Sequence, residues 1–112
     1  MRCLAFFVLL PLLVAGDSGG VRLVRVPNGG VQPQTAVDAK GTIHLLYYSG
    51  DWKHGDLFYV KSSDNGTTFS EPVRVNSEAG SAIAGGTIRG GQIALGRNDR
   101  IHVAWNLSLI HI

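Results

Sequence analysis

Residues 34–47 read QTAVDAKGTIHLLY, and residues 92–105 read QIALGRNDRIHVAW. The two stretches align without a gap at a separation of 58 residues, as two copies of one pattern do. The matching pairs are Gln34 and Gln92, Ala36 and Ala94, Ile43-His44 and Ile101-His102, and Tyr47 and Trp105. Similarity at a fixed period is the sequence signature of a repeat architecture, in which each repeat is one small structural unit.

The hydrophobic pattern around these copies predicts β-strands. Apolar and polar residues alternate over short runs, and turn formers such as DAKG, DNG and GRND separate the runs. The predicted strands are residues 21–27, 34–37, 42–49, 56–63, 68–75, 90–95 and 100–106. No apolar period of 3.6 residues persists for three turns, so no long amphipathic helix is expected. The predicted fold class is all-β.

The repeat also predicts how the strands are organised. Residues 24–26 and residues 73–75 both read VRV, which is a second pair of matching segments. Along the chain, the strands then form the last strand of one unit, a complete unit of four strands, and the first half of another unit. Four antiparallel strands per repeat of this length fit the blade of a β-propeller. Because propellers have about 4 to 8 blades, we expect residues 17–106 to be the N-terminal part of a larger propeller, roughly one and a half blades of it.

Both ends of the chain are expected to lie outside this domain. Residues 1–16, MRCLAFFVLLPLLVAG, combine Arg2, a short apolar run and small residues at a cleavage position. This pattern predicts a signal peptide and a secreted or periplasmic protein. The apolar run is shorter than the roughly 20 residues that a membrane anchor needs. The stretch LSLIHI (107–112) interrupts the repeat where a turn and a third strand are expected, so we interpret it as a non-native tail.

The composition narrows the classes of partner and cofactor. Cys3 is the only cysteine, and its loss with the signal peptide leaves no disulfide and no thiolate ligand. The net charge is +2 with scattered lysine and arginine, which disfavours a nucleic-acid partner. His44 and His102 occupy the same repeat position, which favours packing or hydrogen bonding over a metal pair. We therefore predict no metal, no cofactor and no membrane association after signal removal, and the oligomeric state is left open.

The turn SSDNGTTF (62–69) joins the third and fourth predicted strands of the complete unit. Gly66 allows the positive φ of a tight turn, and Ser62 and Asp64 can bond to turn backbone groups. Phe69 is expected to turn inward and cover those bonds. A calcium loop is the alternative interpretation of DNG, but position 12 counted from Asp64 is a valine and not the glutamate that such a loop needs. The spacing Ser-x-Asp-x-Gly-x-x-Phe resembles the Asp-box, or BNR repeat, of the sialidase superfamily of β-propellers.

The resemblance implies a six-bladed sialidase-type propeller and an activity of exo-alpha-sialidase type, as in the bacterial proteins of this kind. In that family the box is structural and lies away from the active centre. An aspartate in the loop after the second strand is the acid/base group; Asp51 is the better match here and Asp56 is the second. The family's tyrosine nucleophile and its glutamate partner belong to later blades.

The resemblance also suggests residues that bind substrate. Sialidases bind the carboxylate of sialic acid with arginines, and the motif VRVP offers Arg25 as the first of them. Residues 24–26 match residues 73–75, which belong to the outer fourth strand of the unit. By this match Arg25 would be an outer-strand residue instead, and both interpretations stay open. Arg89, at the start of the next innermost strand, is a second candidate. Trp52 lies in the polar connection SGDWKHGD, where an exposed aromatic ring can stack on a sugar; a local hydrophobic lid is the alternative.

The sequence thus leads to three hypotheses about function. The first is a secreted sialidase-like glycoside hydrolase that acts on terminal sugars of glycans, inactive as the present piece because so few blades cannot enclose a pocket. The second is a non-catalytic Asp-box propeller that binds glycan or protein, and the third is another glycan-active enzyme on the same fold. Two acceptor patterns for N-glycosylation, Asn65-Gly66-Thr67 and Asn106-Leu107-Ser108, do not separate these hypotheses.

Overall fold

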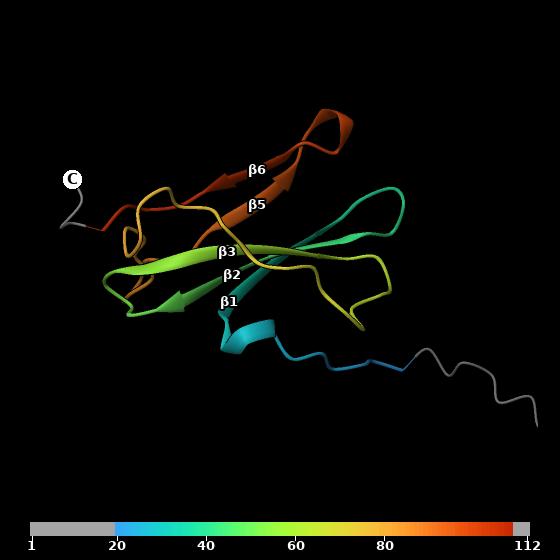
Figure 1. Ribbon diagram of the computed structural model, residues 1–112, viewed down its shortest axis with the longest axis horizontal. Helices are drawn as coiled ribbons and strands as arrows, with labels where there is room; N and C mark the ends of the chain where they lie inside the picture. The colour runs from blue at the N-terminus through green and yellow to red at the C-terminus, as the bar shows by residue number, and fades with distance from the viewer. Residues whose placement is uncertain (1–19, 109–112) are drawn as a thin grey trace, which may run out of the picture.

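The computed structural model describes residues 20–108, so the predicted signal peptide and residues 109–112 lie outside the described part of the chain. The described residues form an all-β structure of antiparallel strands, which confirms the predicted fold class at this level (Figure 1). The elements are η1 (Pro27–Gly29), β1 (Val31–Val37), β2 (Ile43–Gly50), β3 (Gly55–Ser62), β4 (Val73–Arg74), β5 (Gln92–Leu95), η2 (Arg97–Asp99) and β6 (Ile101–Ala104). Within residues 20–108, no helix is long and apolar enough to cross a membrane.

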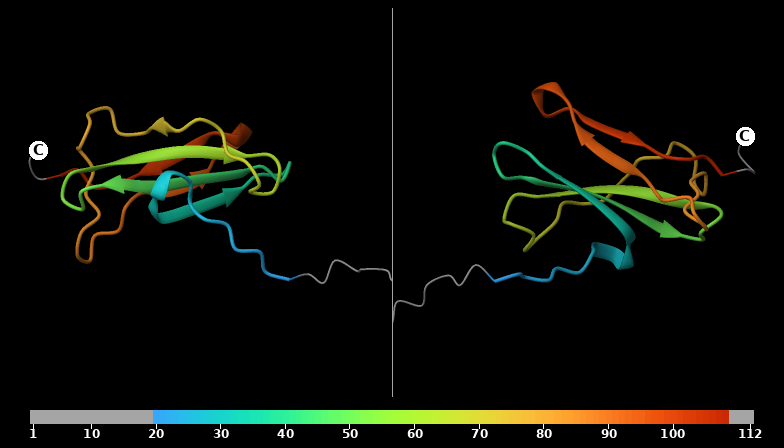
Figure 2. Two further views of the ribbon diagram at one scale, coloured as in Figure 1. Left: turned by 60° about the horizontal axis from the view of Figure 1, so that its bottom comes forward. Right: turned by 180° about the vertical axis from the view of Figure 1, so that it is seen from behind.

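The strands are arranged in two antiparallel sheets. One sheet has four strands in the order β1-β2-β3-β4, and the other is the hairpin of β5 and β6. β2 and β3 pair along their whole length, from Ile43 opposite Ser62 to Gly50 opposite Gly55. Figure 2 shows the β5–β6 hairpin lying over one face of the four-stranded sheet. Each strand therefore pairs with its neighbour in sequence, as short connections between antiparallel strands favour.

The two copies of the sequence repeat fold into hairpins with the same strand register. Ala36 lies opposite His44 in the first hairpin, and Ala94 lies opposite His102 in the second. The glutamines that begin the two copies likewise lie opposite equivalent positions of the second strands. Matching sequence positions thus occupy matching places in the two sheets.

The four-stranded sheet buries side chains on both faces, because successive side chains of a strand point to opposite sides. One face packs against the β5–β6 hairpin, and its cluster consists of Leu46, Tyr48, Leu57, Ala82 and Ala84 with Ile93, Val103, Val75 and Trp105 around them. The other face has a cluster of Leu45, Tyr47 and Val60 beneath Val26, Phe58 and Phe69. The four-stranded sheet is therefore covered on both faces, and the loops that connect its strands lie at its two ends.

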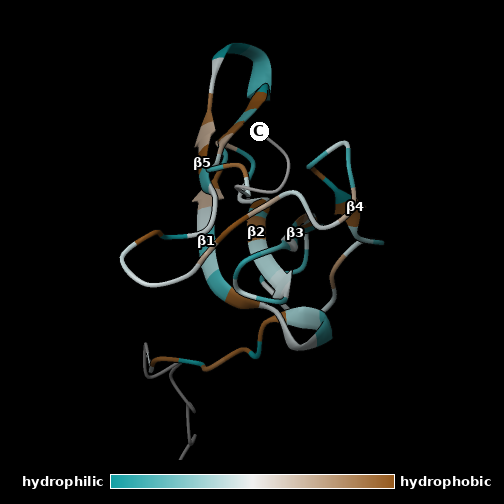
Figure 3. Ribbon diagram, turned by 90° about the vertical axis from the view of Figure 1, so that its left-hand side faces the viewer, coloured by the Kyte–Doolittle hydropathy of each residue, from teal (hydrophilic) through white to brown (hydrophobic). Residues whose placement is uncertain are grey.

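The prediction of a strand at residues 21–27 is wrong. Residues 20–26 belong to no strand, and η1 begins at Pro27. Leu23 is 93% exposed, and this hydrophobic segment runs outside both sheets (Figure 3). Alternation selects side chains that suit a strand, but a strand also needs a neighbour that bonds its backbone. No described residue supplies that neighbour here.

The predicted strand at residues 68–75 is much shorter in the structure. β4 contains only Val73 and Arg74. The stretch before it is tied to β3 at a single position, where the Ser70 N–H donates to the Lys61 carbonyl at 2.9 Å and the Lys61 N–H donates to Ser70 Oγ at 2.9 Å. Pro72 has no N–H for a ladder, which shortens the strand on this side.

Candidate functional site

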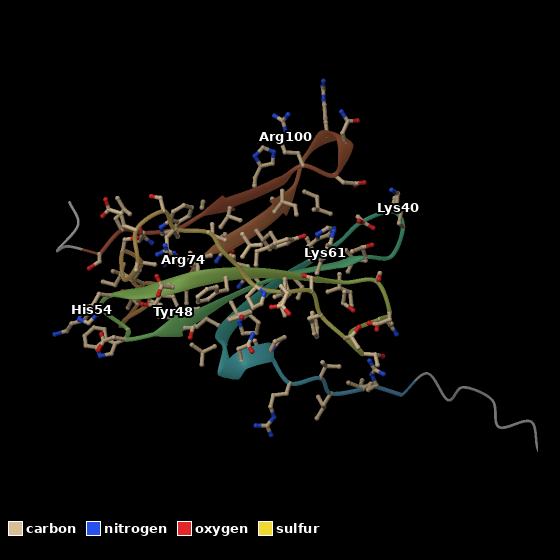
Figure 4. All side chains as sticks on the ribbon, viewed as in Figure 1. Lys40, Tyr48, His54, Lys61, Arg74 and Arg100 are labelled. Atoms are coloured by element: carbon tan, nitrogen blue, oxygen red, sulfur yellow. The ribbon has the colours of Figure 1, made fainter. Side chains whose placement is uncertain are left out.

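Two of the predicted site residues, Asp51 and Trp52, lie in the loop between β2 and β3. Figure 4 shows Tyr48 and His54 at this end of the four-stranded sheet and Lys40 at the opposite end. Hydrogen bonds within the loop fix its shape. The Lys53 N–H donates to Asp51 Oδ1 at 2.8 Å, and the His54 N–H donates to the Asp51 carbonyl at 3.3 Å. The loop is therefore a compact turn on a rigid sheet, a usual setting for binding groups.

Tyr48 anchors this loop from below. Its hydroxyl donates to the Asp51 carbonyl and lies 3.0 Å from the carbonyl oxygen of Ala82. The side chain is almost fully buried, and this burial raises the pKa of the phenol. Tyr48 thus remains a neutral donor that joins the β2–β3 loop to the segment leading to β5.

The Asp51 carboxylate lies at the surface. Its side chain is 49% exposed, and Oδ1 is 3.9 Å from His54 Nδ1. A general acid of a glycosidase is typically a carboxyl group that its surroundings shield from water. The described residues do not shield Asp51 in this way, so its observed role is to cap the turn.

Trp52 presents an exposed ring beside Asp51. Trp52 is 55% exposed. The six-membered part of its ring lies so close to Gly85 that a Cβ atom on residue 85 would be 1.8 Å from Cε3 of Trp52. The Ala84 N–H donates to the Trp52 carbonyl at 2.9 Å, which holds the backbone in place. Lys53 Nζ lies 4.9 Å from the ring centroid, within range of a cation–π interaction. The ring thus packs against Gly85 with one edge while much of its surface faces solvent.

The two candidate arginines do not meet Asp51. Arg25 lines a cavity of about 480 Å³ between the segment before β1 and the other end of the sheet, where Ile43 and Asn65 are also found. Arg89 is exposed and lines two smaller cavities of about 240 and 260 Å³ next to Gly90. Asp51 lines none of these three cavities. The structure therefore places Asp51 and Trp52 in one loop, and neither of them lines the cavities that the two arginines line.

Sequence reasoning missed the role of Gln32. Its φ is 51°, in the left-handed region, and the β1–β2 register shifts between Val31 and Gln34. The side chain compensates, because Nε2 donates to the Ala84 carbonyl at 3.1 Å and Oε1 accepts the Gly90 N–H at 2.6 Å. The positive φ of a non-glycine residue next to a bulge marks this position in the structure, and no pattern in the sequence indicates it.

Sequence reasoning also missed Asn76, which organises the same end of the molecule. Its side chain is 1% exposed; Oδ1 accepts the Leu57 N–H at 2.9 Å, and Nδ2 donates to Asp56 Oδ1 at 2.8 Å and to the Glu78 carbonyl at 2.7 Å. Asp56 Oδ1 also accepts the Gly80 N–H at 2.8 Å. Asp56, the second acid/base candidate, is therefore part of a network that joins β3 to residues 76–81.

The turn at residues 62–69 lies at the opposite end of β3 from the Trp52 loop. Asp64 Oδ1 accepts bonds from Ser62 Oγ at 2.8 Å and from the Thr68 N–H at 2.9 Å, and the Thr68 hydroxyl donates to Oδ2. Ser62 Oγ in turn accepts the Gly66 N–H at 2.9 Å, with Gly66 at a φ of 84°. Phe69 packs against the core cluster below. The polar groups of this turn are thus used to hold its own backbone.

These bonds give the turn a defined dependence on pH. Bonds from the Thr68 hydroxyl, the Thr68 N–H and Ser62 lower the pKa of Asp64 from 3.8 to about 2. Because the folded pKa lies below the unfolded one, the ionised carboxylate stabilises the folded state above about pH 4, and this contribution disappears as the pH falls toward 2. We expect Asp64→Asn to be less stable than the wild type at pH 6, with the difference shrinking toward pH 2. Urea unfolding of both proteins at several pH values measures this; a difference that is constant down to pH 2 would contradict it.

The two repeated histidines contact the turns of their own hairpins. His44 Nε2 lies 3.0 Å from Asp38 Oδ2, and Nδ1 lies 2.7 Å from the Tyr59 hydroxyl. The bond to His44 is the main cause that lowers the pKa of Asp38. In the second hairpin Gly96 stands at the position equivalent to Asp38, and a Cβ atom there would lie 2.5 Å from His102 Nε2. Each histidine thus packs on its turn, and residues 20–108 hold no group of three or more potential metal ligands.

The site is therefore a surface at the β2–β3 end of the central sheet, in which Trp52 is exposed and Tyr48, Gln32 and Asn76 hold the backbone beneath it. Comparisons of the chain with protein-family models, with curated proteins and with solved structures found no match.

Proposed function

We propose that the chain is part of a sialidase-type Asp-box β-propeller that binds terminal sugars of extracellular glycans at the end of the sheet carrying Trp52. The equal register of the two hairpins supports a repeated blade. The packing of the second hairpin on the face of the first sheet supports stacked blades. The self-bonded turn at residues 62–69 supports the structural role that the box has in this superfamily.

The observation that carries the binding function is the exposed ring of Trp52, which packs against Gly85. Sugar rings have apolar C–H faces that pack on aromatic side chains, while their hydroxyl groups need hydrogen-bonding partners nearby. Trp52 provides the apolar surface, and the half-exposed groups of Asp51 and His54 in the same loop provide polar partners. Gly85 packs against the ring and the bond from Ala84 holds its backbone before a ligand arrives, which lowers the entropic cost of binding.

A hydrolase is the second candidate, and the position of Asp51 favours it. Asp51 is adjacent to Trp52, so a sugar stacked on the ring would place polar atoms close to its carboxylate. Catalysis with retention or inversion needs a second carboxylate or an equivalent nucleophile on the other side of the scissile bond. Asp56 is bound to Asn76 and Gly80 instead. Binding is therefore the better supported function of the described residues.

The test is the affinity of the purified chain for immobilised glycans that differ in their terminal sugar, sialyl-lactose and lactose among them. An aromatic contact and its buried area contribute about 1.5 to 3 kcal/mol, so Trp52→Ala should weaken binding about tenfold or more. Trp52→Phe is the matched control and should retain most of the affinity. Equal affinities of the wild type and Trp52→Ala would refute the proposal.

The variant Asp51→Asn separates the two candidate functions. It keeps the acceptor for the Lys53 N–H and removes the ionisable group. If the site only binds, Asp51→Asn should change affinity by less than about tenfold and no release of sugar should occur in either protein. Release of sugar by the complete propeller that Asp51→Asn abolishes would instead establish the hydrolase.

A further inference from the structure

The tip of the turn between β3 and β4 carries the sequence Asn65-Gly66-Thr67. Asn65 and Thr67 are exposed. The bonds that hold the turn involve Ser62, Asp64 and Thr68. Within residues 20–108, no described group bonds the side-chain amide of Asn65 or the hydroxyl of Thr67. The turn therefore uses the hydroxyl of Thr68 for structure, whereas Thr67 contributes only its backbone N–H, which donates to the Asp64 carbonyl at 3.4 Å.

The neighbouring segment leaves the Asn65 amide accessible as well. Arg22 Nη2 donates to the backbone carbonyl of Asn65 at 2.8 Å, so it occupies the main chain and not the side chain. Gly66 is buried with a φ of 84°, which turns the chain back and projects its neighbours outward. Asn65 itself has a φ of 60°, a conformation that asparagine adopts more readily than most residues. The acceptor pattern thus stands at a sharp surface corner.

The second acceptor pattern, Asn106-Leu107-Ser108, has a different environment. Ser108 is 2% exposed, and its N–H donates to the Ser81 carbonyl at 2.8 Å. Leu107 forms a bridge with Ala82, and the Asn106 carbonyl accepts the Ile83 N–H at 3.2 Å. The hydroxyl residue of this pattern is buried and its backbone is paired. The folded chain presents only the first pattern to solvent in full.

We propose that Asn65 is the site of an N-linked glycan and that Asn106 is not. The donor is an oligosaccharide joined to a lipid through pyrophosphate. The side-chain amide nitrogen of Asn65 bonds to C1 of the first sugar, the bond from C1 to the pyrophosphate oxygen breaks, the lipid pyrophosphate leaves, and the amide loses one proton to a base. The proposal requires that residues 1–16 direct the chain into the secretory route, as their pattern predicts.

The position of Asn65 is compatible with the proposed binding surface. The turn of Asn65 follows the C-terminal end of β3, and the Trp52 loop precedes its N-terminal end. A bulky glycan at one end therefore leaves the other end open. The hydrophobic segment of residues 20–26 passes beside the turn, since a Cβ atom at Gly66 would lie 3.6 Å from Val24. A glycan on Asn65 would cover part of this exposed apolar surface.

The test is translation of the full chain in the presence of microsomes that carry out N-glycosylation, with the mass measured before and after treatment with peptide N-glycosidase. We expect one glycan on the wild type and on Asn106→Gln, and none on Asn65→Gln. Thr67→Ala should also remove it, whereas Thr67→Ser should keep it, and neither change touches the bonds of Asp64.

Three results would overturn the proposal. The first is a translocated wild-type chain without a glycan. The second is a glycan that persists in Asn65→Gln and disappears in Asn106→Gln. The third is a chain that does not enter the microsomes at all, because Asn65 would then never meet the donor. The two Thr67 variants are the control for the case in which Asn65→Gln fails to fold. Loss of the glycan in Thr67→Ala but not in Thr67→Ser depends on the hydroxyl group of the acceptor pattern alone.

Discussion

Replacing Asn76 with alanine is expected to lower the free energy of unfolding by about 3 to 5 kcal/mol. The side chain is 1% exposed and supplies both an acceptor and a donor. Its removal leaves the buried Leu57 N–H without a partner and takes one donor from the Asp56 carboxylate. An unsatisfied buried polar group costs about 1 to 3 kcal/mol, and more when a charge is involved.

Urea unfolding followed by tryptophan fluorescence measures this prediction. Asn106→Ala is the matched control, because Asn106 is exposed, and it should change the free energy by no more than about 0.5 kcal/mol. Asn76→Asp provides a further check. It keeps an acceptor for Leu57 but removes the donors and puts a second carboxylate beside Asp56, so it should also be strongly destabilising at neutral pH. A cost of Asn76→Ala within 0.5 kcal/mol of the control would show that the network is dispensable.

The strands of the hairpins and the turns between them could be predicted from sequence because the information is local. Alternation along a strand and turn formers between strands are both read within about ten residues, and the repeat supplies a second, independent copy. The same local rules failed for residues 21–27. Whether an alternating segment becomes a strand depends on a partner elsewhere, and that partner has no local signal.

Some residues of the candidate site could likewise be predicted from local sequence, and others could not. Asp51 and Trp52 could be assigned to a loop because they are polar and aromatic residues in a short connection between two strands with clear alternation. Asn76 could not, since asparagine is common in loops and nothing near residue 76 shows that it bonds to Leu57 across the sheet. Gln32 is similar, because its contacts with Ala84 and Gly90 join segments more than 50 residues apart in the chain. The residues that hold a surface loop in place are therefore harder to predict than the residues that the loop exposes.

Gly55 is the position of the second substitution that we expect to lower the free energy of unfolding strongly. It is buried opposite Gly50 at the start of β3, and its N–H and carbonyl both bond to Ala82, at 2.8 and 3.0 Å. A Cβ atom at this position would lie 2.5 Å from Tyr48 Oη and 2.6 Å from the Ser49 carbonyl oxygen. Real side chains do not approach so closely, so Gly55→Ala must displace either the tyrosine or the strand.

We expect Gly55→Ala to lower the free energy of unfolding by about 2 to 4 kcal/mol, from overpacking together with the loss of the Tyr48 hydroxyl's interaction with the carbonyls of Asp51 and Ala82. A double-mutant cycle with Tyr48→Phe checks the mechanism. Removing the hydroxyl relieves the closest contact and has already cost this shared interaction, so Gly55→Ala should be milder by about 1 kcal/mol in that background. Strictly additive costs in urea unfolding would mean that the strand moves and the tyrosine does not. If the tyrosine moves, the Trp52 loop loses its anchor, and Gly55→Ala should then weaken glycan binding even under conditions where the chain remains folded.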